Sequence, residues 1–229
     1  LDANGDGYTR AEACGVVEMA GLDDDEYPAI VMVCGSAVNQ DGRSSSLTAP
    51  NGPSQQAVIR NALETTELDI PEFEQLEMHG TGTSLGDPIE VGAAAAVLLN
   101  ARIKRGPITL WAAKSAHGHA EAGAGILNMN HVTGSLSHLE TCCVTNLKFV
   151  NPYVAETMSI AKLTYAPRQD VPIVHTHTTG FACGSSAFAF QGTNAHVIVG
   201  TADDERAYVT SQAVAFDKYS LWLSPRTHP

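Results

Sequence analysis

The sequence has few basic residues and no long apolar stretch. Its 13 lysines and arginines stand against 25 aspartates and glutamates, so the formal net charge is −12 at pH 7. This excess of negative charge argues against nucleic acid or an anionic membrane surface as the main partner. No apolar run approaches the roughly 18 residues that a membrane-spanning helix needs, and no signal peptide opens the chain. We therefore expect no membrane span.

The sequence also lacks a cysteine framework. Its five cysteines are irregularly spaced and form neither a disulfide pattern nor a zinc-binding pattern. Cys142 and Cys143 are adjacent in a strand-like run, where they serve as small hydrophobic side chains on opposite faces. This usage fits an intracellular, reducing compartment, most simply the cytoplasm. We predict no metal site.

The first residues imitate a calcium loop but lack its last ligand. Asp2 to Gly7 has the acidic and glycine spacing of such a loop. A calcium loop requires a glutamate at its twelfth position, which here is Ala13. We predict a turn in its place.

Two strand–turn–helix units each place a histidine at the turn. The first has a strand over residues 73–78, His79 in a glycine-rich turn, and a helix that follows Pro88. The second has a strand over residues 108–113, His119 in the turn, and a helix of small residues. Because α/β folds bind ligands beyond the carboxyl ends of their strands, both rings are predicted to point at one site. The residue pattern alone is also compatible with a buried, structural role for each of the two histidines.

Four stretches of the sequence resemble one family. Residues 79–90 are similar to the first histidine motif of β-ketoacyl synthases, in particular the ketosynthase domains of modular polyketide synthases. Residues 114–121 resemble their lysine–histidine motif, and residues 35–56 and 186–197 resemble two further stretches. The four occur in family order and extend over most of the chain.

The resemblance implies the fold. We expect an α/β chain of the thiolase-like kind, a layered α/β/α/β/α arrangement. Residues 1–50 would end its N-terminal half, residues 51–200 would form its C-terminal half, and residues 201–229 a surface tail. Apolar strands are expected over residues 14–19 and 29–34 without their own sheet partners, which would expose apolar surface unless another chain covers it.

The remaining secondary structure is predicted from pattern alone. Ser54 can cap a helix whose inner face carries Val58, Ile59, Ala62 and Leu63. Strands are expected over residues 141–147, 160–165 and 195–199, with a turn at residues 151–152.

The resemblance also implies a reaction. The family consists of acyltransferases that join a malonyl-type thioester to an acyl thioester by decarboxylative Claisen condensation, in polyketide or fatty acid biosynthesis. His79 and His119 would donate hydrogen bonds to the thioester oxygen as the enolate forms. Lys114 would hold the second histidine and fix the local charge, with Glu121 as its partner.

Further residues would position the substrate. By resemblance, Thr81 and Thr83 lie near the pantetheine arm, and Phe190 lies near the acyl pocket and supplies a backbone N–H. The phosphopantetheine arrives on an acyl carrier protein, and no cofactor is bound covalently. Family members are homodimers. The tight basic cluster at Arg102, Lys104 and Arg105 is either a docking patch for an acidic carrier protein or a solvated loop.

The resemblance leaves one essential group unaccounted for. In the family the nucleophilic cysteine lies upstream, in a Cys-Ser-Ser elbow, and the chain is expected to begin after that point. None of the five cysteines stands in such an elbow. The chain alone is therefore expected to be inactive in condensation, with the missing half supplied by a longer protein or another chain. The alternative is a non-catalytic, ketosynthase-like partner or structural subunit of a larger assembly; a thiolase-type enzyme ranks last.

The sequence departs from the family near the site. Ala116 and His117 replace an asparagine and an aliphatic residue, and Ala189 and Gln191 replace glycines of the closing loop. If the loop positions require a positive φ, each replacement costs about 1 kcal/mol or more.

Overall fold

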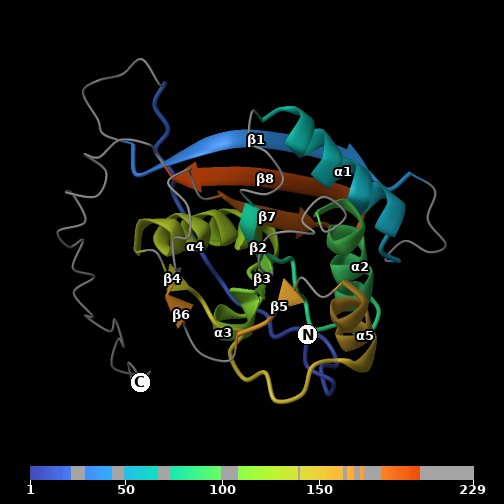
Figure 1. Ribbon diagram of the computed structural model, residues 1–229. Coiled ribbons are helices and arrows are strands. Elements are labelled where there is room, and N and C mark those ends of the chain that lie inside the picture. Colours follow the sequence, from blue (N-terminus) through green and yellow to red (C-terminus); the bar gives the residue numbers. More distant parts are fainter. Residues whose placement is uncertain are drawn as a thin grey trace, which may run out of the picture.

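The computed structural model describes residues 1–21, 29–42, 49–66, 73–98, 108–138, 140–161, 164–167, 171–172 and 182–201. Its main sheet has six strands in the spatial order β1 (Val31–Gln40), β8 (Thr193–Thr201), β7 (Ala182–Phe188), β2 (Phe73–Glu77), β3 (Ile108–Trp111) and β5 (Thr164–Tyr165) (Figure 1). Strand β8 is antiparallel to both of its neighbours, β1 and β7, whereas β7, β2, β3 and β5 run parallel to one another. A second, small sheet pairs β4 (Glu140–Thr141) with β6 (Val171–Pro172).

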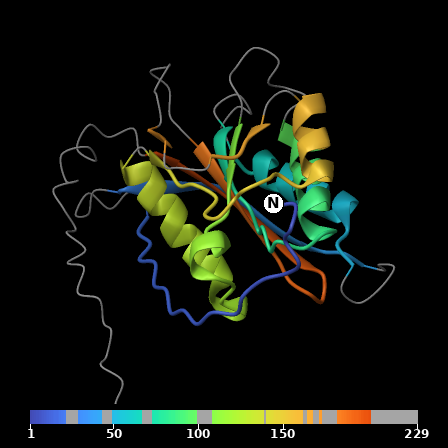
Figure 2. The same ribbon diagram turned by 90° about the horizontal axis from the view of Figure 1, so that it is seen from below.

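Helices cover both faces of the main sheet (Figure 2). Helix α4 (Ala124–His138) packs on one face, against β7 and β8, and follows α3 (Lys114–His117) and the 3-10 turn η2 (Glu121–Gly123). On the other face, α1 (Gly52–Glu64) packs on β1 and β8, next to α2 (Gly86–Leu98), and α5 (Pro152–Ala161) packs on α2. The predicted α/β class is confirmed, and one sheet lies between two helical layers.

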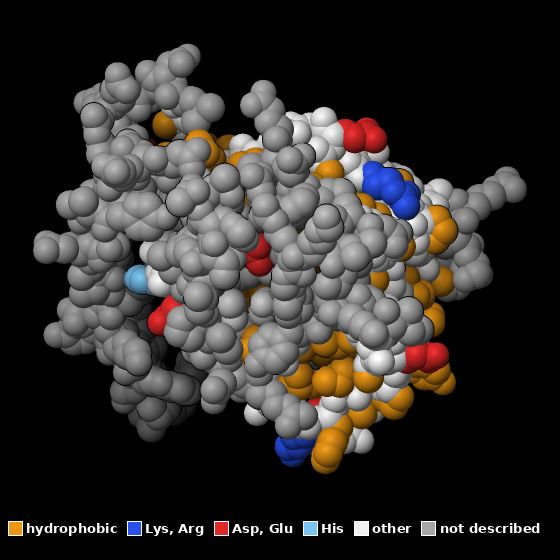
Figure 3. Space-filling view, in the orientation of Figure 1, with side chains coloured by type: hydrophobic (Ala, Val, Ile, Leu, Met, Phe, Trp, Pro, Cys, Tyr) orange, Lys and Arg blue, Asp and Glu red, His pale blue; other side chains and the backbone are white. Residues whose placement is uncertain are grey.

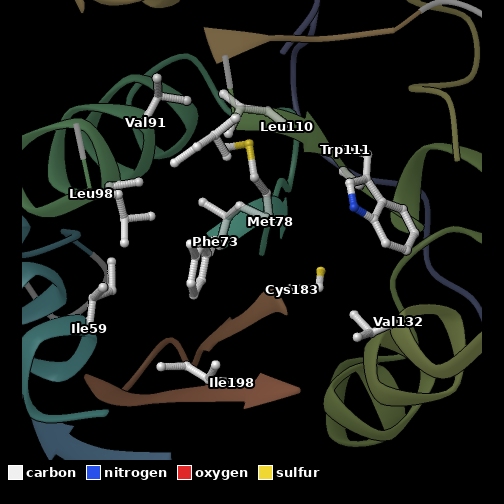
Figure 4. Packing of buried hydrophobic residues seen from close by; sticks show 14 of the residues in the cluster. Ile59, Phe73, Met78, Val91, Leu98, Leu110, Trp111, Val132, Cys183 and Ile198 are labelled. Carbon is white, nitrogen blue, oxygen red and sulfur yellow. The ribbon is translucent and has the colours of Figure 1, made fainter. Parts of the chain in front are cut away.

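The core lies on both sides of the central strands. Strands β2 and β3 are buried without clear alternation because parallel strands covered by helices on both faces have no solvent-facing side. Helix α1 contributes Ile59, α4 contributes Val132, and strands β7 and β8 contribute Cys183 and Ile198 (Figure 4). The other labelled members of the cluster are Phe73, Met78, Val91, Leu98, Leu110 and Trp111.

Helix α1 has its predicted inner face but a different cap. Val58, Ile59 and Ala62 are buried as expected, and Leu63 is partly buried. The cap is Asn51, whose side-chain oxygen accepts the backbone N–H of Ser54 at 3.2 Å. The prediction that Ser54 caps this helix is therefore wrong by one turn, because Asn51 satisfies the free N–H group at position 54.

The predictions for the first 40 residues need correction. Residues 14–19 form no strand, and Val16 is 83% exposed there. The strand predicted over residues 29–34 is β1, which starts at Val31 and continues to Gln40. It is not left without a sheet partner, since it pairs with β8 along its length. The division of the chain at residue 50 stays a prediction.

Three predictions between residues 141 and 165 also differ from the structure. The strand expected over residues 141–147 is limited to β4, and Cys142 and Cys143 follow it outside any strand. The turn expected at residues 151–152 is the start of α5, where Asn151 accepts the backbone N–H of Tyr153 at 3.0 Å. Helix α5 extends to Ala161, so the strand predicted over residues 160–165 is reduced to β5. The predicted final strand over residues 195–199 is confirmed within β8.

The described part of the chain exposes several large apolar side chains. In the view of Figure 3, hydrophobic side chains gather at the lower right, toward α5. Phe149 and Tyr153, which precede and begin this helix, are 67% and 69% exposed. None of the helices in the described ranges is long and apolar enough to cross a membrane. The basic cluster at residues 102–105 and the tail after residue 201 lie outside the described residues.

Candidate active site

The two predicted histidines lie side by side. His79 follows β2, and His119 follows the short helix α3 after β3. These two strands are parallel neighbours, so their carboxyl ends present both turns at one edge of the sheet (Figure 1). The ring centroids of His79 and His119 are 5.4 Å apart, and the rings are nearly perpendicular, with an interplanar angle of 85°. The structure thus brings the two rings together as the sequence predicted.

Backbone hydrogen bonds assign the tautomer of each ring. The Nδ1 atom of His79 accepts the N–H of Phe188 at 3.3 Å, and Nδ1 of His119 accepts the N–H of Glu121 at 3.0 Å. A neutral imidazole that accepts at Nδ1 carries its hydrogen on Nε2. Each ring therefore has one N–H, at Nε2, available for donation.

Both rings are held uncharged. Burial, then the nearby charge of Lys114 and the second histidine, lower the pKa of His79 from 6.5 to about 3. Burial and Lys114 also lower the pKa of His119, and Glu121 opposes this in part. Because a lowered pKa disfavours the imidazolium, both side chains are neutral hydrogen-bond donors near pH 7.

The rings open into a cavity of about 700 Å³. Thr81, Thr83 and Phe190, all predicted from the sequence, line it together with His79 and His119. Phe190 is 58% exposed, which places it at an open part of the wall. The hydroxyl oxygens of Thr81 and Thr83 lie 3.3 Å apart. Much of the remaining wall is apolar, from Ala122, Ala124, Gly125, Ala187, Phe188, Ala189 and Ala195.

Residues 30–148 match the family model of the β-ketoacyl synthase C-terminal domain. The chain belongs to the β-ketoacyl synthase family. This confirms the resemblance that the histidine motifs indicated.

Relatives of this ketosynthase chain are polyketide synthases. It is 38% identical over 201 residues to mycoketide-CoA synthase of Mycobacterium tuberculosis, a match that spans 86% of the chain and 5% of the relative. It is 36% identical over 215 residues to polyketide synthase GfsA of Streptomyces halstedii, over 93% of the chain and 3% of the relative. A solved oxazolomycin ketosynthase domain of Streptomyces albus is 28% identical with a TM-score of 0.78, over 88% of the chain and 36% of the domain. The chain thus spans a small part of its curated relatives, and its α/β fold is that of the thiolase-like ketosynthases.

Lys114 lies behind the histidines in a buried acidic environment. Its Nζ donates to Oδ1 of Asn128 at 3.5 Å, and its pKa is lowered by burial, against the opposing charges of Glu77 and Glu90. The prediction that Glu121 is its partner is wrong. Oε1 of Glu121 instead lies 3.2 Å from Nε of Arg10, in an exposed ion pair.

Glu90 and Glu77 are site residues that the sequence reasoning missed. The Glu90 carboxylate accepts the N–H of His79 at 2.6 Å and that of Gly80 at 2.9 Å, which fixes the first histidine turn. Glu77 accepts the N–H of Ala113 at 2.9 Å, just before Lys114. Burial raises the pKa of Glu77 to about 8 and that of Glu90 to about 7, so the two carboxyls hold protons far more readily than exposed ones.

The N-terminal segment is the second missed feature. Gly7 donates its N–H to the carbonyl of Gly82 at 3.1 Å, in the first histidine turn. The N–H of His119 donates to the carbonyl of Thr9 at 2.7 Å, and its carbonyl accepts the N–H of Ala11 at 3.0 Å, so the segment also holds the second turn. The Tyr8 ring lies against that of His119, with centroids 4.6 Å apart. These paired backbone groups are far apart in the sequence, and pairing of this kind leaves no local pattern in the residues. The position of the N-terminal segment therefore could not be predicted.

Ala189 and Gln191, which replace glycines of the family's closing loop, cause no backbone strain. Among the described non-glycine residues, only Glu121 and Asn146 have a positive φ. The turn between β7 and β8 takes its positive φ, 85°, at Gly192, so Ala189 and Gln191 do not meet the cost that a positive φ would impose.

No thiol of this chain lines the histidine cavity. All five cysteines lie in the described part of the chain, and none is among the residues of its wall. Cys183 is fully buried, and burial raises the pKa of its thiol far above the ordinary value. The described residues also contain no group of three or more histidine, cysteine, aspartate or glutamate side chains that could hold a metal ion.

Proposed function

We propose that this chain carries the decarboxylating part of a ketosynthase site, which condenses a malonyl-type thioester with an acyl thioester. The observation that supports this most directly is the pair of neutral imidazoles. Their Nδ1 atoms are both occupied by backbone N–H groups, and both rings line one cavity. Two Nε2–H donors can therefore reach the same substrate oxygen.

The chemistry explains why two neutral donors are useful. When the carboxylate leaves as carbon dioxide, the electron pair of the broken C–C bond moves into an enolate, and negative charge grows on the thioester oxygen. Donors aimed at that oxygen stabilise the transition state more than the ground state. Neutral rings donate without the mutual repulsion of two imidazolium ions. Lys114 has a positioning and charge-fixing role in this proposal, since it lies behind the rings and lowers the pKa of both.

Other residues of the cavity would position the substrate. Thr81 and Thr83 are placed to contact the pantetheine arm, and Phe190 to contact the acyl chain; Glu121 supports His119 through its backbone N–H. We propose that an acyl carrier protein delivers the phosphopantetheine and that a cysteine outside this sequence holds the acyl group as a thioester. Polyketide biosynthesis is the process that the relatives favour.

A non-catalytic role is the second candidate. It is favoured by one observation, that no cysteine of the chain lines the cavity. A ketosynthase-like protein that only assembles with other chains would keep the fold without using the histidines.

The two candidates differ in a simple assay. Decarboxylation needs the histidine donors but no nucleophilic cysteine, so the chain should convert malonyl-pantetheine to acetyl-pantetheine and carbon dioxide. It should not form acetoacetyl-pantetheine when acetyl-pantetheine is added. Mass spectrometry of the pantetheine products measures both. Decarboxylation no faster than in buffer would reject the proposed function and leave the structural role.

The pH dependence of this decarboxylation is a further prediction. The pKa of both histidines is lowered, that of His79 to about 3, so each ring gains its proton and its repulsive charge at a lower pH than an ordinary histidine. We therefore expect the acid limb of kcat/KM that reflects protonation of the rings to lie below the ordinary histidine pKa of 6.5. An acid limb centred at or above pH 6.5 would contradict the assigned environment of the rings.

A further inference from the structure

A second pair of histidines lies outside the active-site cavity. His117 on α3 and His131 on α4 approach with their Nε2 atoms 2.7 Å apart and their ring centroids 4.7 Å apart. His117 is exposed, whereas His131 is partly buried with its ring 6.0 Å from that of Trp111. Neither histidine lines the cavity of His79 and His119.

The short separation is that of a hydrogen bond between the two nitrogens. At 2.7 Å, one Nε2 must carry a hydrogen and the other must offer its lone pair, so a single proton lies between them. A metal ion that displaces this hydrogen and lies beside the line between the two nitrogens would be bound by both lone pairs, once the rings have turned toward it. Imidazole nitrogen is the protein ligand best suited to zinc, copper and nickel.

The distance discriminates between coordination geometries. Two nitrogens at about 2.0 Å from a metal lie about 2.8 Å apart when they subtend a right angle and about 3.3 Å apart in a tetrahedral site. The observed 2.7 Å is close to the right-angle value. We propose that His117 and His131 form a two-histidine site for a divalent transition-metal ion with right-angle coordination, Cu²⁺ before Ni²⁺ or Zn²⁺, with water in the remaining positions.

The surroundings agree with this assignment. The His131 ring is packed beside Trp111, so one ligand is held in place, while the exposed His117 can turn its ring toward the ion. The chain carries a net charge of −12, which favours a cation.

A bound ion would join α3 to α4 next to the active site. Helix α3 begins at Lys114, and His117 precedes His119 by two residues. The ion would therefore hold the turn that presents the second catalytic ring. It would also stabilise the folded chain, because it binds the native pair and not the separated histidines of the unfolded state.

The test is titration of the metal-stripped full chain with copper(II) chloride, followed by calorimetry and electron paramagnetic resonance. We expect one site with an axial spectrum that shows nitrogen coupling. His117→Gln should weaken it at least tenfold and remove the coupling. This variant changes an exposed side chain, so the fold is expected to persist, and circular dichroism checks it. The matched control is His138→Gln, on the exposed end of α4, which should bind within twofold of the parent chain.

Thermal unfolding gives an independent readout. Saturating Cu²⁺ should raise the Tm of the parent chain and of His138→Gln but not that of His117→Gln. Equal copper affinity in the parent chain and His117→Gln would overturn the site. An equal loss of copper affinity in His117→Gln and His138→Gln would also overturn the site, because the ion would then be bound by several histidines spread over the chain.

Discussion

Replacing either His79 or His119 by alanine should lower the rate of malonyl-pantetheine decarboxylation by about 10²–10³-fold, the usual effect of removing one donor from a developing oxyanion. The loss should appear in kcat more than in KM, because the donors act mainly when charge has moved to the oxygen. The double variant should lose less than the product of the two single effects, since the rings act on one atom. Product formation measured by mass spectrometry under saturating substrate gives all three values.

The control for this prediction is His138→Ala. It removes an exposed imidazole from the end of α4 and should leave the rate unchanged. A loss of less than about threefold in His119→Ala, with the variant folded, would mean that His119 does not touch the reacting thioester. The side-by-side rings would then need a structural explanation, such as packing against Tyr8 and Phe188.

The convergence of the two rings could be predicted because its causes are local. His79 directly follows β2, His119 follows β3 after the single turn of α3, and two parallel strands of one sheet present their ends at the same edge. The glycine-rich turns and the helices after them are also local signals. These patterns predict one site for His79 and His119, and the family resemblance predicts the same placement.

The environment of the site could not be predicted in the same way. Glu90 reaches back to His79 across the first turn, and Gly7 and Thr9 pair with turns whose positions are far along the chain. Neither the alternation of apolar residues nor the spacing of motifs in the sequence indicates such contacts. The assignment of Glu121 as the partner of Lys114, which the family resemblance implied, is also wrong. The helix ends between them at Gly118, whose φ is 78°, and Glu121 therefore faces Arg10 at the surface.

Errors in the fold have equally specific causes. The strand predicted over residues 14–19 has the right composition, but no described strand pairs with it. Strand β1 continues through the polar residues Asn39 and Gln40 because β8 supplies a backbone partner for them. Asn151 and Pro152 were interpreted as a turn, although an asparagine cap followed by proline is also the usual start of a helix, which is what they form.

Substituting Gly184 by alanine should produce a large loss of stability for the addition of a single methyl group. Gly184 lies in β7, between Leu76 of β2 and Ile198 of β8. A Cβ atom there would overlap Cζ of Phe73 and come within 2.8 Å of the His196 ring. Both rings are in the core, stacked with centroids 6.3 Å apart, and Nδ1 of His196 is bonded to the Ser186 hydroxyl at 3.0 Å. Neither ring can move without disturbing packing or a buried hydrogen bond, so we expect a cost of about 3 kcal/mol.

Chemical denaturation of Gly184→Ala and of Gly92→Ala separates this steric effect from the general effect of replacing glycine. Gly92 lies within α2, and a Cβ there meets no atom of the described residues within 4 Å. Its replacement should therefore stabilise the chain, by about 0.5–1 kcal/mol, because alanine favours the helix. We expect the free energy of unfolding to fall in Gly184→Ala and to rise in Gly92→Ala. A Gly184→Ala chain as stable as its parent would show that a methyl group fits beside Phe73. Because β7 ends at Phe188, whose N–H holds the ring of His79, decarboxylation should decline together with stability in the Gly184 variant alone.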